Sequence, residues 1–504
     1  MSKFYITTAI AYTNAKPHIG FAMELIQADV LARYRRLVGD EVYFLTGTDE
    51  HGLKMAQKAR EMGVTPQEAV DENSKPFQKL TKILNISNDD FIRTSSERHN
   101  RGAQKLWQAL VEADAFYKDT YSGLYCVGCE AYITEKDLVN GKCPIHLKPP
   151  ESFKEENYFF RYSQYLPQVK KMIESGELRI VPESRKTEII NLIEKSLEEK
   201  QNVSFSRPAQ TLSWGVPVPN DPNQTMYVWC DALSNYMTAL DYENDGALYK
   251  KFWPADVHLI GKDILRFHAG FWIAMLLAAK LPTPKAIYVH GYITSDGQKM
   301  SKTLGNVVDP VEMVQQYGLD PVRYYLLREI PTTDDGDFSR TRFEAVFDSE
   351  LANNLGNLVS RVLTMTEKYH DSKVPPMVRE EAIVNEVLKT WKEYQNHIDG
   401  FNLKAALEAM VGLLMFANKY IDDKKPWELA KKDPAQVLQI LYHLLEILRH
   451  VSFMLTPFMP DTAAKIQAAL HVEGGKLYPD NISWGGLKEG ATVKKIEALF
   501  PRLK

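Results

Sequence analysis

The chain has 504 residues, of which 44% are hydrophobic and 25% are charged, and its formal net charge is −4. This length predicts two to four domains, and this composition excludes a disordered, collagen-like or disulfide-stapled protein. The small negative charge gives no sign of a nucleic-acid partner, although a sum over the whole chain hides any local basic surface.

The first residues lack the features of a secretory signal. The longest apolar stretch, residues 271–279, is shorter than the roughly 20 residues that a bilayer span requires. We therefore expect a cytoplasmic protein with no membrane partner, and residues 271–279 predict a buried helix.

The first ~110 residues alternate between strand-like and helix-like segments, which is the pattern of a parallel sheet. Residues 4–10 predict a strand, and residues 23–37 predict a helix. Gly39 predicts the end of that helix. Its apolar side chains fall on one face: Met23, Ile26, Val30 and Leu37.

From about residue 117 to residue 208 the alternation stops, and this part holds three of the four cysteines and the strand-like residues 158–160. We interpret it as an insertion into the first fold. Alternation resumes with strands predicted at residues 258–260 and 286–289.

After about residue 348 the sequence becomes helical. Residues 401–421 and 437–455 predict two helices, and Pro457 ends the second. An earlier helix is predicted from an apolar stripe at helical spacing: Leu351, Leu355, Leu358, Val362 and Met365.

Two polar loops each follow a strand-like segment. His18 stands where the first predicted strand gives way to the first helix, and parallel α/β proteins bind nucleotides at such places. The second loop, between Gly297 and Gly305, carries Lys299 and Lys302, whose ammonium groups suit a polyphosphate. Taken singly, His18 could be an ordinary turn residue and the lysines a solvated surface.

Together the two loops resemble the HIGH and KMSKS signatures of class I aminoacyl-tRNA synthetases. The segments TGTDEHG (46–52), YVWCDAL (227–233) and HLIGKDI (258–264) narrow the resemblance to methionyl-tRNA synthetases. It runs from residue 4 to about residue 430, and more weakly to the end. Phe21 stands where the family usually has the second histidine of HIGH, and Thr303 replaces the final serine of KMSKS.

The resemblance implies an α/β fold with a Rossmann-like class I synthetase catalytic domain. A connective insertion with a zinc knuckle splits this domain, and an α-helical bundle that binds the anticodon follows it. The expected limits are 1–116 for the first catalytic half, 117–208 for the insertion, 209–315 for the second half with the KMSKS-like loop, 316–350 for a linking fold and 351–504 for the helical domain.

Paired ligand motifs predict one structural zinc ion. Cys126 and Cys129 are separated by two residues, as are Cys143 and His146, so two tight turns can place three thiolates and one imidazole around one ion. The alternative is a set of free thiols. Cys230 is left over, and we expect it to be a small core residue.

The resemblance implies that ATP and magnesium bind at the two loops. His18 would donate to the phosphates, Gly20 would let ATP approach the backbone, and Lys299 and Lys302 would hold the polyphosphate. These four are the expected catalytic residues. The full expected ATP set is His18, Gly20, Gly261, Asp263, Ile293, Lys299 and Lys302, with Asp263 at the ribose and Ile293 at the adenine.

The resemblance also carries a methionine pocket onto this chain. Asp49 would hold the substrate ammonium, Tyr12 and His268 would contact the sulfur side, and Trp229 and Trp272 would form walls. Trp272 lies within an apolar run and could equally be a core residue. The expected set is Ala9, Ile10, Tyr12, Asp49, Trp229, Ala232, Leu233, Tyr236, Ile264, His268 and Trp272.

Asn357, Arg361 and Trp427 match the anticodon-reading positions of the family. Asn357 and Arg361 are four residues apart and so share one helix face, while Trp427 could stack on an unpaired loop base. The plainer interpretation is a surface arginine and a tryptophan that covers a helical core.

The resemblance therefore implies ATP-dependent activation of L-methionine to methionyl-adenylate, then transfer to the 3′ end of tRNA(Met), both initiator and elongator. One alternative is a class I synthetase for leucine, isoleucine or valine, but the insertion is too small for an editing domain. Another is a catalytically weakened relative that only binds tRNA, which Phe21 favours. The chain ends soon after the helical region, so we expect a monomer.

Overall fold

Seven parallel strands form the main sheet of the computed structural model, which describes residues 2–127, 131–133, 135–145, 147–300, 306–472 and 482–503. The strand order is β2-β3-β1-β12-β13-β8, and β4 pairs with β3. The strands are β1 (Lys3–Thr8), β2 (Ala11–Tyr12), β3 (Glu41–Asp49), β4 (Asp90–Arg93), β8 (Arg179–Val181), β12 (Val257–Gly261) and β13 (Ala286–His290). The strands predicted at residues 4–10, 258–260 and 286–289 are confirmed.

The strand order reverses beside β1. On one side β1 pairs with β3, which follows it closely in the chain, and on the other side with β12, which comes about 250 residues later. In open parallel sheets a ligand crevice forms outside the carboxyl ends of the strands at such a reversal. The topology therefore directs attention to the residues that follow β1, β3 and β12.

Helix α1 (Ile19–Leu37) follows β1 and carries His18 as its N-cap residue. Gly39 ends the turn after it with a φ of 96°, as predicted. The four predicted apolar side chains are buried, but so are Glu24, Gln27 and Asp29 on other faces. The reason is that α1 packs against both the sheet and α12 (Leu319–Arg328), so most of its surface is covered.

The predicted insertion contains a separate antiparallel sheet in the order β6-β5-β7-β9, formed by β5 (Phe116–Cys126), β6 (Ala131–Ile133), β7 (Glu151–Phe160) and β9 (Val203–Ser204). Helices α5 (Tyr162–Ser175) and α6 (Glu183–Glu198) flank β8 in sequence. Because β8 pairs with β13, the segment predicted as the insertion, residues 117–208, includes one strand of the main sheet. The domain limits themselves stay predictions.

A small sheet leads into the KMSKS-like loop. β14 (Ile293–Ser295) pairs with β15 (Gln298–Lys299) and with β16 (Gly336–Phe338). Asp296 and Gly297, which join β14 to β15, both have positive φ, as a two-residue hairpin turn requires.

Further elements complete the α/β part: α2 (Leu53–Met62), α3 (Pro66–Ile83), α4 (Glu97–Glu112), α7 (Val228–Leu233), α8 (Asn235–Thr238), α9 (Ala247–Phe252), β10 (Ser206–Pro208) and β11 (Gln224–Met226). Most of residues 271–279 are buried, as predicted, in a π-helical turn (Phe267–Trp272) followed by α10 (Ile273–Ala278).

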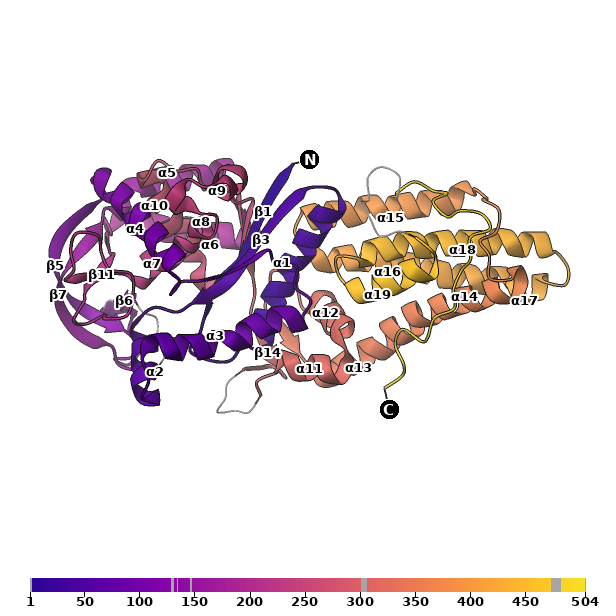
Figure 1. Cartoon of the computed structure of the whole chain (residues 1–504), viewed down its shortest axis with the longest axis horizontal. Helices are drawn as coiled ribbons and strands as arrows, with labels where there is room; N and C mark the ends of the chain where they lie inside the picture. The colour runs from indigo at the N-terminus through magenta and orange to yellow at the C-terminus, as the bar shows by residue number, and fades with distance from the viewer. Residues whose placement is uncertain are drawn as a thin grey trace.

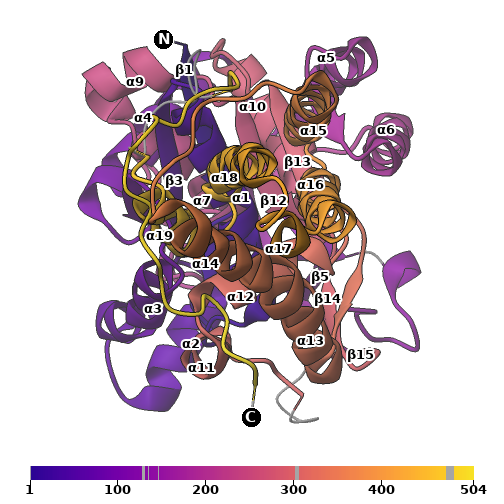
Figure 2. The same cartoon turned by 90° about the vertical axis from the view of Figure 1, so that its right-hand side faces the viewer.

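A helical part projects from one side of the α/β part (Figure 1), and its helices pack side by side when viewed end-on (Figure 2). The predicted helices at 401–421 and 437–455 are confirmed as α16 (Leu403–Lys424) and α18 (Pro434–Leu455), and the predicted apolar stripe begins in a π-helical segment, η5 (Phe347–Gly356). In the described part of the chain no helix is both long enough and apolar enough to cross a membrane. Two helices, α11 (Pro310–Tyr317) and α13 (Arg340–Val346), come before the helical part in the chain. The helical part itself contains η5 (Phe347–Gly356), α14 (Asn357–His370), α15 (Glu381–Asp399), α16 (Leu403–Lys424), α17 (Pro426–Leu429), α18 (Pro434–Leu455) and α19 (Pro460–Ala469).

Candidate functional site

A cavity lies at the carboxyl ends of β1 and β3, where the strand order reverses. Its remaining walls come from α7, α8 and the segment after β12. Most of the lining is apolar, and Asp49 supplies one carboxylate. The lining residues are Ala9, Ile10, Asp49, Trp229, Ala232, Leu233, Asn235, Tyr236, Ile264 and His268. Nine of the eleven residues predicted for the methionine pocket are therefore brought together, and Asn235 is an addition that the sequence analysis missed.

One wall of the cavity is polar but uncharged. The Tyr236 hydroxyl lies 2.7 Å from Nε2 of His268, whose Nδ1 lies 2.9 Å from the carbonyl oxygen of Ile264. Because a carbonyl can only accept, Nδ1 carries the proton and Nε2 accepts from Tyr236. Burial lowers the pKa of His268 to about 4 and raises that of Tyr236. Both groups are therefore neutral near pH 7, and such a wall suits a polarisable, uncharged side chain.

Two of the predicted pocket residues do not line the cavity. Trp272 is fully buried and donates to Nε2 of His258, whose ring lies 4.2 Å from that of Tyr236. Trp272 therefore stands behind the wall and supports it through His258. Tyr12 lies beside Asp49 in the β2–β3 pair, and its hydroxyl donates to the carbonyl of His51 at 2.8 Å.

Of the three consecutive titratable residues at the end of β3, only Asp49 lines the cavity. The Glu50 carboxylate is buried and accepts from Arg93. His51 contacts the buried Asp231 through Nδ1 at 2.7 Å, and Asp231 also contacts His99. Burial alone would raise the pKa of Asp231, but the two histidines lower it to about 2. Of the three acidic side chains Asp49, Glu50 and Asp231, Asp49 is thus the one that lines the cavity.

The first loop holds His18 in a defined tautomer. The Gly20 amide donates to Nδ1 of His18 at 3.1 Å, so a neutral ring carries its proton on Nε2. Desolvation lowers the pKa of His18, which favours this neutral form. A Cβ at position 20 would lie 2.9 Å from Cε1 of His18, so a side chain there would displace the ring. Gly20 therefore leaves the His18 ring in place, with its Nε2–H as a donor at the helix N-terminus.

Phe21 is partly buried and packs against aromatic and apolar side chains. Its ring meets that of Phe77 on α3 edge to face, with centroids 5.4 Å apart. It also borders the large apolar core that contains α1. The packing between α1 and α3 thus accommodates phenylalanine at this HIGH position.

Glu24 is a buried carboxylate close to Tyr236 of the cavity wall, and the sequence analysis did not single it out. It is buried on α1, its Oε2 lies 2.8 Å from Nε2 of His290 at the end of β13, and its Oε1 has no hydrogen-bond partner among the described residues. Burial raises the pKa of Glu24, and nearby Asp263 adds to the effect. An acidic residue within an apolar helix is the signal that could have revealed it.

The predicted nucleotide contacts Gly261, Asp263 and Ile293 lie at or just after the ends of β12 and β13. Gly261 and Ile293 are buried, whereas Asp263 is exposed. A Cβ at Gly261 would lie 3.2 Å from Oδ1 of Asp263, so the glycine leaves room for this carboxylate. Lys302 lies outside the described residues, and of Lys299 only the backbone is described.

Comparison with known families matches most of the chain. The model described as "tRNA synthetases class I (M)" matches residues 4–151 and 134–363, and "Anticodon binding domain of methionyl tRNA ligase" matches residues 374–504. Methionine–tRNA ligase of Clostridium acetobutylicum is 45% identical across 99% of this chain and 78% of its own length. The chain belongs to the methionyl-tRNA synthetase family.

Other members of this family agree in sequence and structure. Methionine–tRNA ligase of Brucella suis is 42% identical across 99% of this chain and 98% of its own length. Mycobacterium tuberculosis methionyl-tRNA synthetase in complex with methionyl-adenylate superposes with a TM-score of 0.94, at 38% identity and full coverage of both chains. The class I catalytic fold with a helical anticodon-binding domain is thereby confirmed.

The predicted anticodon residues lie on α14 and α17 of the helical part. Asn357 begins α14 and is exposed, and Arg361, one turn later, forms an ion pair with Asp422 of α16 at 2.9 Å. Trp427 lies in α17 and is 45% exposed, which argues against a role in the helical core. Their roles in RNA recognition stay predictions.

The predicted zinc knuckle is only partly described. Cys126 and Cys143 are buried, and the turn after Cys143 is closed by a hydrogen bond from the Leu147 amide to the Cys143 carbonyl. Cys129 and His146 lie outside the described residues. Within the described ranges no group of three candidate metal ligands occurs. Cys230 is a buried core residue, as predicted.

Proposed function

We propose that the protein is a methionine–tRNA ligase. The observation that carries this proposal is the cavity at the sheet reversal, which combines one carboxylate with an apolar, neutral wall. A carboxylate can hold the α-ammonium group of an amino acid, while the neutral wall accepts its thioether. Membership of the methionyl-tRNA synthetase family supports the same conclusion.

In the first step a carboxylate oxygen of methionine attacks the α-phosphorus of ATP. A new oxygen–phosphorus bond forms, and the bond to pyrophosphate breaks. Positioning and charge stabilisation supply most of the rate. Asp49 holds the ammonium, Nε2–H of His18 donates to the phosphates, and Lys299 and Lys302 bind the departing pyrophosphate with magnesium. In the second step the terminal ribose hydroxyl of tRNA(Met), initiator or elongator, attacks the activated carbonyl and AMP leaves.

The test is amino-acid-dependent ATP–pyrophosphate exchange with each of the twenty amino acids. We expect strong exchange with methionine alone. Stronger exchange with leucine, isoleucine or valine would overturn the substrate assignment, and no exchange with any amino acid would overturn the activity.

We also propose one structural zinc ion per chain, bound by Cys126, Cys129, Cys143 and His146. Three thiolates and one imidazole form the closed tetrahedral donor set typical of structural zinc. Cys126 ends β5 and both described cysteines are buried, so a metal there would join the ends of the knuckle to the insertion sheet.

Zinc content should follow this donor set. Protein purified without chelator is expected to carry one zinc ion per chain by native mass spectrometry, and Cys143→Ser is expected to lose most of it. Cys230→Ser is the matched control, because Cys230 lies in the core near the cavity and should leave the zinc in place. Metal-free wild-type protein would reject the site.

The exposed Trp427 should serve tRNA rather than adenylate formation. Stacking on a base is typically worth ~1–3 kcal/mol, so Trp427→Ala is expected to lower tRNA charging about tenfold to a hundredfold. ATP–pyrophosphate exchange should stay nearly unchanged, because the cavity lies in the α/β part. Trp391→Ala, which removes a fully buried tryptophan of the same helical part, is the comparison for a purely structural loss. Equal loss in both assays for Trp427→Ala would show that it acts as a core residue.

A further inference from the structure

Glu50, the neighbour of Asp49, is a buried carboxylate with a complete set of partners. Its side chain is fully buried, and its oxygens accept from the hydroxyls of Thr48 and Ser95 and from Nε of Arg93 at 2.8 Å. In the described part of the chain Arg93 is the only cation within ion-pair distance of Glu50. A buried carboxylate without such a partner is costly, so Glu50 depends on Arg93.

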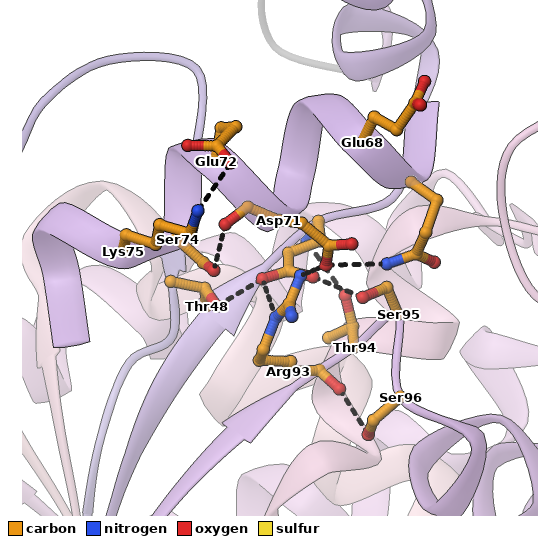
Figure 3. Close-up of polar contacts among 12 residues, drawn as sticks. Thr48, Glu68, Asp71, Glu72, Ser74, Lys75, Arg93, Thr94, Ser95 and Ser96 are labelled. Carbon is orange, nitrogen blue, oxygen red and sulfur yellow. Dashed lines mark hydrogen bonds and ion pairs between the residues drawn. The ribbon is translucent and has the colours of Figure 1, made fainter. Parts of the chain in front are cut away.

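Arg93 ends β4 and joins the strand ends to α3. Its second contact is Asp71 of α3, at 2.6 Å from Nη2. Figure 3 shows Arg93 between α3, which carries Asp71, and the polar residues Thr48, Thr94 and Ser95. The guanidinium therefore binds one carboxylate in the interior and another nearer the surface.

Thr94 connects this cluster to the cavity. Its hydroxyl oxygen accepts from the backbone amide of Glu50 at 2.9 Å and lies 3.4 Å from Oδ1 of Asp49. Asp49 lines the cavity, whereas Glu50 is held on the other side of the strand end. The direction of the Asp49 carboxylate is thus tied to the position of Glu50.

We propose that Arg93 is a positioning residue for the amino-acid substrate: by holding Glu50 and the end of β3, it aims Asp49 at the α-ammonium group. This inference rests on the proposed function. Arg93 does not line the cavity, and the His18 loop is held by separate contacts. Its removal should therefore weaken amino-acid binding and leave ATP binding unaffected.

The test compares Arg93→Met, Arg93→Lys and Glu50→Gln in the full chain. Arg93→Met is expected to raise the KM for methionine about tenfold, with the KM for ATP changed less than about twofold, since small misplacements of a binding group are costly. Equilibrium binding of methionine without ATP, by calorimetry, should weaken by the same factor. Arg93→Lys keeps the charge and should recover most of the loss. Glu50→Gln should also raise the KM for methionine. In the double variant Arg93→Met with Glu50→Gln this KM should rise no further than in the more affected single variant, because both changes remove the same contact.

Arg98→Met is the matched control. Arg98 forms a bidentate ion pair with Asp90, the first residue of β4, and does not contact Glu50. It should leave both KM values unchanged. Equal rises in the methionine and ATP KM values, additive effects of the Arg93 and Glu50 changes, or a matching effect in Arg98→Met would overturn the inference. If Arg93→Met does not fold, the same comparison of the KM for methionine with the KM for ATP is made in Glu50→Gln and Arg93→Lys. Failure of wild-type protein to show methionine-dependent exchange would instead overturn the proposed function.

Discussion

Replacing His18 with alanine is expected to slow adenylate formation on the order of a hundredfold to a thousandfold, as the loss of one preorganised donor to developing charge typically does. The structure gives the reason. The Gly20 amide occupies Nδ1, so the proton on Nε2 is free to meet a phosphate oxygen. Pre-steady-state measurement of methionyl-adenylate formation checks the effect, and methionine binding without ATP should stay unchanged because His18 does not line the cavity.

Phe21→His is the companion to this variant. Phe21 packs against Phe77 of α3, and we expect the restored histidine to change the rate of adenylate formation less than about tenfold, or ~1.4 kcal/mol. A gain on the order of a hundredfold or more would show that the natural chain is catalytically weakened, and would favour the tRNA-binding alternative. A small effect of His18→Ala would contradict the role given to this loop.

Replacing Arg323 with methionine is expected to lower the free energy of unfolding by ~3–5 kcal/mol, the cost typical of breaking a buried ion pair. Arg323 is fully buried on α12 and pairs with Asp29 of α1 at 2.7 Å. It also donates to the carbonyls of Leu84, Pro457 and Phe458. One guanidinium thus joins α1, whose N-cap is His18, to the turn between α18 and α19. Chemical denaturation followed by circular dichroism measures the loss.

Arg33→Met is the control for this prediction. Arg33 pairs with the same Asp29 carboxylate at 2.7 Å, but its side chain is 19% exposed and makes fewer buried contacts. We expect a loss of about 1 kcal/mol or less. Similar losses for Arg33 and Arg323 would contradict this account.

The sequence by itself determined the order of strands and helices, because apolar periodicity and chain punctuation are local properties. It placed β1, the turn at Gly39 that follows α1, and the helices α16 and α18. It also named nine residues of the cavity wall, although they come from segments more than 250 residues apart. That step depended on motif resemblance, since spacing alone cannot bring such distant residues together.

Only the tertiary structure decided which side chains face the cavity. In Asp49-Glu50-His51 every residue is titratable, but Glu50 and His51 are held by Arg93 and Asp231, and of the three only Asp49 lines the cavity. Trp272 stands behind the wall, Asn235 joins it, and β8 enters the main sheet from within the predicted insertion. The physical reason is the same in each case: a side chain's direction depends on buried hydrogen-bond and ion-pair partners far away in sequence, and local patterns carry no record of those partners.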